Sequence, residues 1–303
     1  FWTSLERTGA GYFDYYLLHN IGEPRLPAFD NFGIWDFLRE RKAEGRIRHL
    51  GFSFHDSPEM LERVLKDHPD MDFVQLQINY ADWEDPAIQA RGCYEVARKF
   101  DKALVIMEPV KGGTLANLPP EVLKPFEKAG LNPVAGALRF AASLDGVITV
   151  LSGMSTLEQV EDNLKTFTDF VPMEEKEYQA IDKVKEIMNS RIQNGCTGCR
   201  YCMPCPKGVD IPGIFRCYNA MYTESKSQGR FQFAQTVGLT KEPAFASQCI
   251  ECGKCEKHCP QNIPIREKLK EADKALRPLP YKAGINMVRN YMFRKSGDKE
   301  RAK

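Results

Sequence analysis

Short apolar runs alternate with amphipathic stretches over the first half of the chain. The runs are rich in β-branched and aromatic residues and are apolar on both faces, as strands covered on both sides should be. Strands that alternate with helices predict parallel pairing through right-handed crossovers, and therefore an α/β fold. The five runs are residues 14–18, 48–52, 73–78, 103–108 and 147–151.

Helix starts are marked between these runs. Ser57 and Asn132 each stand before a proline, which gives an N-cap residue followed by proline at the first helical position. Thr156 and Gln159 form a T-x-x-Q capping box. A further helix is predicted at residues 173–192, as a link to the second half of the chain.

Five strand–helix units leave two architectures open. A (β/α)₈ barrel needs eight units in about 250 residues, whereas an open doubly wound sheet would be complete with five. No G-x-G-x-x-G follows any of the five runs, which removes the usual dinucleotide-binding turn of the open sheet.

Five motifs at the ends of the predicted strands carry a family resemblance. They read, in order, FDYYLLHN, GRIRHLGFS, VQLQINY, EPVKGGTL and VLSGMSTLEQVEDN. This succession resembles the aldo/keto reductase family from its fourth barrel strand to its eighth, over roughly Leu5 to Phe170. The resemblance implies a partial (β/α)₈ TIM barrel of about strands 4 to 8, with the first three units upstream of Phe1. The chain is therefore expected to be N-terminally truncated.

The resemblance also implies chemistry. Family members pass a hydride between a nicotinamide cofactor, NAD or NADP, and a small-molecule carbonyl or alcohol. His19 matches the histidine beside the reacting oxygen, whereas the catalytic aspartate, tyrosine and lysine belong to the strands that are not in this chain. The chain alone is therefore expected to be inactive as a carbonyl reductase.

Several cofactor-binding residues can be matched by the same resemblance. Ser53 matches a serine that holds the nicotinamide carboxamide, and Gln75 matches a glutamine on the next strand. Phe54 replaces the family's usual asparagine, and Met107 stands where many members place an aromatic ring. Residues 109–115 match the loop over the cofactor phosphates.

The last motif bears on the choice between NAD and NADP. Members that prefer the 2′-phosphate place a lysine and an arginine at positions that match Gly153 and Gln159, so that choice stays open here. Asp162 and Asn163 resemble the family's adenine contacts. His55 and Asp56, just past the Ser53 strand, either line the site or form a surface loop.

The number and distribution of the cysteines add a second kind of chemistry. The chain has 303 residues, of which 43% are hydrophobic and 27% charged, a globular balance that indicates about two domains. Eight of its ten cysteines fall in two short runs, where they are poorly placed for disulfides and well placed to wrap a metal centre. This usage indicates a reducing compartment, and we expect a cytoplasmic protein.

The two runs predict two [4Fe–4S] clusters. The second run has the spacing C-x₂-C-x₂-C-x₃-C-P of bacterial ferredoxins, whose fourth cysteine binds the other cluster of a pair. The first run ends in x₂ with Pro204 inside it. Zinc is the alternative, but zinc ribbons use separated cysteine pairs. With crossed pairing, one cluster is held by Cys196, Cys199, Cys202 and Cys259, and the other by Cys249, Cys252, Cys255 and Cys205.

The stretch between the two runs has helical spacing. This arrangement resembles an all-helical ferredoxin domain, predicted over residues 193–273. Cys93 and Cys217, outside the runs, are expected to be ordinary buried thiols. The apolar positions that carry the helical pattern are Ile214, Phe215, Tyr218, Met221 and Tyr222.

Charge is distributed unevenly. The net charge is +1, but residues 274–303 contain nine Lys or Arg and two acidic residues. This basic C-terminal tail is either solvated or weakly docked, or it contacts an acidic partner, for which a ferredoxin or flavodoxin is the candidate. No nucleic-acid-binding pattern is present, and no apolar stretch is long enough to predict a membrane span.

Taken with the barrel-like part at residues 1–172, these features predict an iron–sulfur oxidoreductase of aldo/keto reductase type, whose clusters relay electrons. The alternative is an electron-transfer protein with a catalytically inactive barrel, which the departures at Phe54, Met107 and Gln159 favour. The clusters could also be structural, as staples of a domain with little core of its own.

Overall fold

The structure is a computed structural model that describes residues 1–23, 25–86, 88–196, 198, 200–259 and 261–300, with side chains up to residue 293. Cys199 and Pro260, both part of the predicted cluster motifs, lie outside the described residues. The chain divides into two units: Phe1–Ala116 with Pro125–Asp182, and Asn117–Lys124 with the chain from Lys183 onward.

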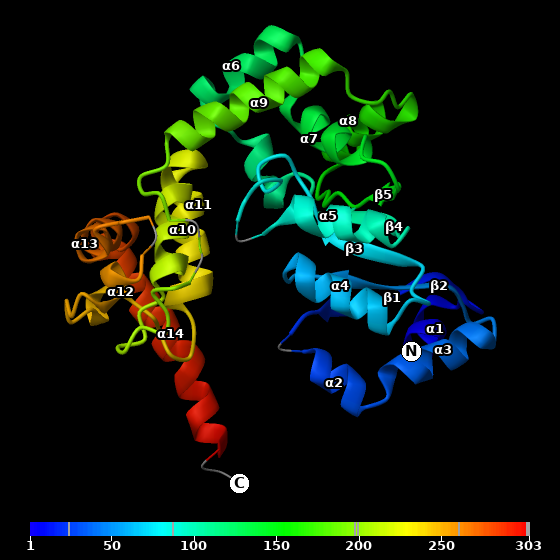
Figure 1. Cartoon of the computed structure of the whole chain (residues 1–303), viewed down its shortest axis with the longest axis horizontal. Coiled ribbons are helices and arrows are strands. Elements are labelled where there is room, and N and C mark those ends of the chain that lie inside the picture. Colours follow the sequence, from blue (N-terminus) through cyan, green and yellow to red (C-terminus); the bar gives the residue numbers. More distant parts are fainter. Residues whose placement is uncertain (24, 87, 197, 199, 260, 301–303) are drawn as a thin grey trace. The chain divides into compact units, whose positions relative to one another are not determined.

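The first unit is built on a parallel sheet of five strands in the order β1-β2-β3-β4-β5 (Figure 1). Right-handed crossovers that always step in one direction place all the connecting helices on the same face, as in a barrel. A doubly wound sheet would reverse its order at a switch point, so the open-sheet alternative is excluded. The strands are β1 (Phe13–Ile21), β2 (Ile47–Phe54), β3 (Phe73–Gln77), β4 (Ala103–Met107) and β5 (Val147–Val150), close to the five predicted runs.

Helices connect the strands and cover the sheet, with α3 packed on β2, α5 on β3 and β4, and α7 on β5. The helix predicted as a link, α9, crosses the boundary between the two units at residue 182. The elements are α1 (Trp2–Thr8), α2 (Leu26–Asn31), α3 (Ile34–Ala43), α4 (Pro58–Asp67), α5 (Ala90–Lys99), η1 (Lys111–Ala116), α6 (Pro120–Ala129), α7 (Pro133–Ala142), α8 (Leu157–Thr168) and α9 (Glu175–Ser190).

The predicted helix starts are confirmed by their hydrogen bonds. The Ser57 side chain accepts from the backbone N–H of Met60, and that of Asn132 accepts from the second and third residues of α7. Both hydrogen bonds of the Thr156–Gln159 capping box are present. Each cap satisfies backbone donors that the first helical turn leaves unpaired.

One glycine fixes how closely β2 approaches β3. Gly51 is paired in register with Phe73, and a Cβ at Gly51 would lie 2.4 Å from the carbonyl oxygen of Phe73. No side chain fits in that space, which explains the glycine in the middle of the GRIRHLGFS motif.

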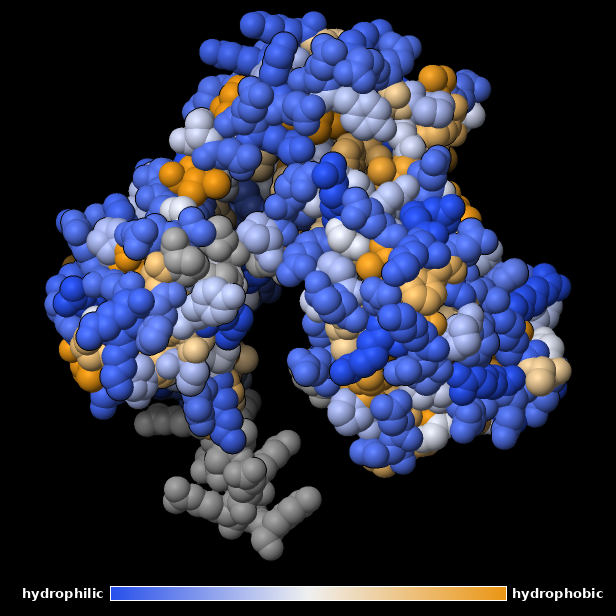
Figure 2. All heavy atoms as spheres, viewed as in Figure 1, coloured by the Kyte–Doolittle hydropathy of each residue, from blue (hydrophilic) through white to orange (hydrophobic). Residues whose placement is uncertain are grey.

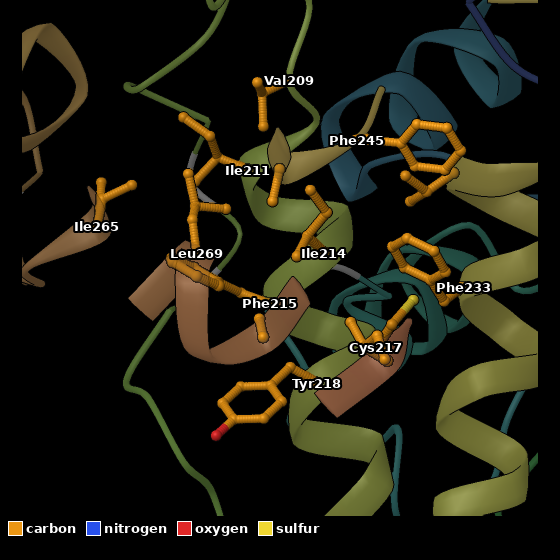
Figure 3. Close-up of a cluster of buried hydrophobic side chains, with 14 of the residues drawn as sticks. Val209, Ile211, Ile214, Phe215, Cys217, Tyr218, Phe233, Phe245, Ile265 and Leu269 are labelled. Carbon is orange, nitrogen blue, oxygen red and sulfur yellow. The ribbon is translucent and has the colours of Figure 1, made fainter. Parts of the chain in front are cut away.

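The second unit is helical and is centred on α10, where the sequence predicts a helix. Apolar side chains of α10, α11 and α13 pack together in its core (Figure 3). Ile214, Phe215, Tyr218 and Met221 are buried, as the helical spacing predicts. The elements are α10 (Ile211–Thr223), α11 (Lys226–Phe233), η2 (Ala234–Gly238), η3 (Ala246–Gln248), α12 (Lys254–Lys257), α13 (Ile265–Leu276) and α14 (Leu279–Glu300).

One expectation for this unit needs correction. The unit has a substantial apolar core, so the idea of a domain with little core of its own is wrong. The basic tail begins in α13 and α14, where Arg277 is 7% exposed, paired with Asp273 and stacked on Phe245. A guanidinium can be buried when its charge and its flat face are both matched.

The surface in view is mainly hydrophilic, with apolar residues scattered across it (Figure 2). Among the described residues, no helix is long and apolar enough to cross a membrane.

Candidate functional site

The carboxyl ends of the strands bring several of the predicted residues together. Between β1 and β2 the register shifts after Leu18, and Asn20 has a φ of 62°. The backbone N–H of Asn20 donates to the hydroxyl of Ser53 at 2.7 Å. Bulges of this kind commonly lie beside active sites, where they redirect a side chain. Ser53 is fully buried and keeps its hydroxyl hydrogen for another acceptor.

Ser53, Gln75 and Met107 lie on one face of the sheet. Ser53 pairs in register with Gln75, and Met107 pairs with Gln77, two residues further along β3. Side chains two residues apart on a strand point the same way. The side-chain amide of Gln75 donates to the Met107 sulfur at 3.3 Å. The matched positions thus form a continuous polar and thioether surface.

His19 and His55 lie near this surface. His19 is exposed at the bulge, and His55 follows the end of β2. The pKa of His55 is lowered, first by partial burial and then by the positive charge of His19 and Arg25, whereas Glu108 opposes the shift. Lowering the pKa keeps the His55 imidazole neutral at pH 7.

His55 and Asp56 line a small cavity of about 80 Å³ together with Cys93. The carboxylate of Asp56 accepts from the backbone N–H groups of Glu23 and Ser57, both at 2.7 Å, so it orders two loops. Burial, with Asp56 and Glu59 nearby, raises the pKa of Cys93 to about 12. This shift fits the ordinary buried thiol predicted for Cys93.

A buried ionic network at the ends of β3 and β4 was missed by the sequence analysis. Asp82 is 1% exposed and accepts from Gln77 at 2.9 Å, from Asn79 at 2.8 Å and from Lys111 at 2.8 Å. Burial alone raises the pKa of Asp82, but the charge of Lys111 and the hydrogen bonds outweigh it, so the pKa is lowered. The available signal was a cluster of polar residues directly after an apolar strand.

The glycine-rich loop after β4 is anchored by this network. Lys111 belongs to both, and Gly112 and Gly113 have φ values of 60° and 88°, which favour glycine. The hydroxyl of Thr114 is buried and has no hydrogen-bond partner among the described residues. Within this loop the backbone N–H groups of Lys111, Gly113 and Leu115 donate to the carbonyl oxygens of Glu108 and Val110. The Thr114 hydroxyl is therefore a group with a hydrogen bond to offer a ligand, in the stretch of residues 109–115 that the resemblance assigns to the cofactor phosphates.

In the last of the five motifs, the side chains of Gln159 and Asn163 form hydrogen bonds within the protein. The Gln159 side-chain oxygen accepts from the backbone N–H groups of Ser155 at 2.7 Å and Thr156 at 3.3 Å. Asn163 is 9% exposed and donates to the Ser152 hydroxyl at 2.8 Å.

The remaining two positions of this motif are less constrained. Asp162 is half-buried on α8, and no atom lies within 4 Å of a Cβ placed at Gly153. Neither Gly153 nor Gln159 places a cation at this turn.

In the second unit, the cysteine runs form tight loops. Residues between successive cysteines adopt positive φ, namely Gly198 and Arg200 in the first run and Glu251 and Gly253 in the second. Each left-handed residue bends the backbone, so that two thiols with two residues between them turn toward a common side. No disulfide joins two of the described cysteines.

Two cavities group the cysteines. The larger, of about 240 Å³, is lined by Cys205, Cys249, Cys252 and Cys255, with Cys202 beside them. The smaller is lined by Cys196, Cys202 and Cys259. Cys205 thus lines the cavity of the second run and Cys259 that of the first, whereas Cys202 lines both and Cys199 lies outside the described residues. No three metal-binding side chains among the described residues converge on a single ion.

The apolar core and a side chain of α10 hold these loops in place. Cysteines of both runs pack against the apolar core around α10. Asn219 on α10 accepts from the backbone N–H of Gln193 at 3.0 Å and of Asn194 at 3.2 Å, and it donates to the Asn194 carbonyl at 3.0 Å. The Glu251 N–H donates to the sulfur of Cys249 at 3.4 Å. Such N–H···S contacts are a usual feature of iron–sulfur sites.

The fold and the two cysteine cavities define a barrel-type α/β unit joined to an iron–sulfur-type unit. The chain belongs to the aldo/keto reductase family, whose model matches residues 1–186, and a 4Fe-4S dicluster domain model matches residues 195–263. The predicted resemblance and the α/β fold are confirmed. No curated protein matches the chain.

Solved structures similar to this chain are aldo/keto reductases. The holo form from Bacillus halodurans is 24% identical, with a TM-score of 0.46 over 60% of this chain and 61% of that one. The Brucella melitensis structure is 25% identical, with a TM-score of 0.47 over 60% and 65%. A Klebsiella pneumoniae structure in complex with NADP and acetate is 18% identical, with a TM-score of 0.48 over 60% and 62%. The chain therefore spans less than two thirds of the length of these proteins.

Proposed function

We propose that this chain is part of a cytoplasmic iron–sulfur oxidoreductase that interconverts a small carbonyl compound and its alcohol with a nicotinamide cofactor, and whose two [4Fe–4S] clusters relay electrons. The observation that carries the proposal is the crossed grouping of the cysteines around two cavities, in one chain with an aldo/keto reductase unit. The complete protein would supply the rest of the barrel.

In the barrel unit, this chain's residues would hold the cofactor and one side of the substrate. Ser53, fixed by Asn20, would donate to the carboxamide, and Gln75 and Met107 would line the ring. The loop of Gly112 and Gly113 would receive the phosphates. A bound nicotinamide supplies or accepts a hydride. His19 stands at the strand ends, where it would donate a hydrogen bond to the substrate oxygen.

In the second unit, the thiolates would hold the two clusters, which supply one-electron transfer when present. Hydride transfer moves two electrons together, so a carbonyl reductase supplied with NADPH needs no cluster. A relay explains the second unit, because it would connect a one-electron carrier with two-electron chemistry.

The test is a reduction experiment under anaerobic conditions on the complete protein. The clusters are reduced with dithionite, excess reductant is removed, and oxidised cofactor or a candidate carrier is added. We expect the visible spectrum of the clusters to return to the oxidised form. Clusters that stay reduced with every cofactor and carrier, in a protein where Cys→Ser changes affect only stability, would refute the relay.

A second candidate is an electron-transfer protein with an inactive barrel. It is favoured by Gln159, which is committed to the capping box, and by Phe54, which is 2% exposed where the family usually has an asparagine. Turnover of small aldehydes by the complete protein with NADH or NADPH would exclude this candidate.

A further inference from the structure

The larger cysteine cavity opens to solvent through an unusual set of side chains. Tyr201 is 68% exposed and Ile250 is 58% exposed, although both line the cavity and stand next to its cysteines. Cys252, which lines the same cavity, is itself exposed. Large apolar side chains held in solvent beside a buried site indicate a contact surface. We name five of the exposed lining residues the cluster rim: Tyr201, Pro204, Lys207, Ile250 and Lys254.

The charge of this surface has one sign. The lining that the structure describes contains Lys207, Lys254 and Arg266 and no carboxylate. Two acidic residues that adjoin the cavity cysteines in the sequence are paired, since Glu256 pairs with Arg266 at 2.7 Å and Glu251 with a lysine of α13 at 2.8 Å. Within the described part of the chain, Lys207 and Lys254 form no ion pair, so their charge is directed to solvent.

We propose that the cluster rim is the docking surface for an acidic one-electron carrier protein of the ferredoxin or flavodoxin type. The inference rests on the proposed clusters, and it places electron entry at the cavity of Cys205, Cys249, Cys252 and Cys255. The reduced carrier loses one electron, which enters the cluster held there. No atom is transferred, and the cluster is reduced by one electron as the carrier is oxidised by one.

The chemistry of the rim favours this partner. Transient redox complexes bury little surface, and a few exposed aromatic and aliphatic side chains surrounded by like charges suit a rapid, reversible encounter. Electrostatic attraction to an acidic surface would raise the association rate at low salt. Electron transfer also requires a short distance between the carrier and the cluster, and the rim residues line the same cavity as the thiols.

The C-terminal helix is a weaker docking site for the same carrier. Arg277, one of its nearby cations, is buried and already paired. Residues of α14 line neither cysteine cavity. Two basic residues of this helix, Lys282 and Arg289, therefore provide a matched control with the same change in net charge.

The test compares the K207E/K254E variant with the K282E/R289E variant. Reduced acidic ferredoxin is mixed with each oxidised protein in an anaerobic stopped-flow instrument, at low and at high salt. We expect K207E/K254E to lower the second-order rate constant about tenfold or more at low salt, with the difference shrinking at high salt. The control should stay within about twofold of the wild type. A parallel measurement with flavodoxin shows which carrier type is used.

Three further readouts separate docking from damage. Iron and sulfide content should be unchanged in K207E/K254E. The midpoint potential, which two reversed charges beside the cavity lower, is measured in each variant, and the rate of photoreduction by a small neutral deazaflavin should fall no further than that shift accounts for. A Y201A/I250A variant should lower the carrier rate at both salt concentrations, because it removes apolar contact and leaves the charge intact.

The proposal is overturned if K207E/K254E is reduced by the carrier as fast as the wild type, or if both charge-reversal variants slow equally. It is also overturned if size-exclusion chromatography shows a dimer that Y201A/I250A converts to a monomer, since the rim would then be covered by a second copy of the chain. Absence of iron and sulfide from the wild-type protein would instead remove the proposed function itself.

Discussion

Among single residues, Asp82 shows how the strand ends of the first unit are organised. It joins β3, the following loop and the glycine-rich loop through Gln77, Asn79 and Lys111. A carboxylate that is 1% exposed is tolerated because a cation and several donors surround it. The position of the proposed phosphate loop therefore depends in part on this ion pair.

We expect Asp82→Asn to lower the free energy of unfolding by about 2–3 kcal/mol at pH 7, because it removes the buried carboxylate that pairs with Lys111 at 2.8 Å. The pKa of Asp82 is lowered in the folded state. The ion pair therefore stabilises fully above the unfolded pKa of about 3.9, and this contribution is lost as the pH falls through the folded value.

Urea unfolding followed by tryptophan fluorescence measures this effect, since Trp2, Trp35 and Trp83 all lie in the first unit. The difference between wild type and variant should be constant from pH 8 to about pH 5 and shrink only below about pH 4. A difference that already disappears near pH 6 would show that Asp82 does not hold its charge in this way.

Cofactor preference is also decided at single residues. With no cation at Gly153 or Gln159, we expect the complete protein to bind NADPH and NADH with similar affinity. Gln159→Arg should shift the preference toward NADPH about tenfold, because a guanidinium pairs with the 2′-phosphate. Fluorescence titration measures both affinities, with Gln159→Met as the control that also removes the capping contact. A wild-type preference for NADPH of 100-fold, about 2.7 kcal/mol, would mean that another cation makes this contact.

The helices and strands were predictable because local patterns and packing agree. The five apolar runs became β1 to β5, and Ser57, Asn132 and Thr156 cap helices as predicted. Strand order was not predictable from periodicity, which is the same in a barrel and in a doubly wound sheet. The family resemblance, not the pattern, pointed to the barrel.

The site was only partly predictable for a related reason. Cysteine spacing alone is enough to identify a cluster loop, because the ligands are close in the sequence. The Asp82–Lys111 pair joins residues 29 positions apart, and no local pattern records that contact. The Asn20 bulge, which holds Ser53, likewise depends on the register of β1 against β2.

Gly51 tests the packing of β2 against β3. We expect Gly51→Ala to destabilise the first unit by about 1–3 kcal/mol, because its Cβ would lie 2.4 Å from the Phe73 carbonyl oxygen and push the strands apart. Gly11→Ala is the matched control, since no atom lies within 4 Å of a Cβ at that position. Urea unfolding by tryptophan fluorescence should place the control within about 0.5 kcal/mol of the wild type. Equal effects of the two changes would contradict the close approach.

For the whole molecule, the main consequence is that the two cysteine runs act together. Cys205 lines the cavity of the second run, and Cys259 lines the cavity of the first. Each cluster would therefore depend on cysteines more than forty residues apart in the chain. Neither run alone would form a complete cluster site.

The most direct test of the account is the metal and sulfide content of the anaerobically prepared protein, with electron paramagnetic resonance of Cys205→Ser and Cys259→Ser. We expect about eight irons and eight acid-labile sulfides per wild-type chain. Cys259→Ser should perturb the cluster that Cys196→Ser also perturbs, and Cys205→Ser the cluster that Cys249→Ser perturbs. Stoichiometric zinc without sulfide would contradict the account, and so would a Cys259→Ser signal that matches the Cys249→Ser signal.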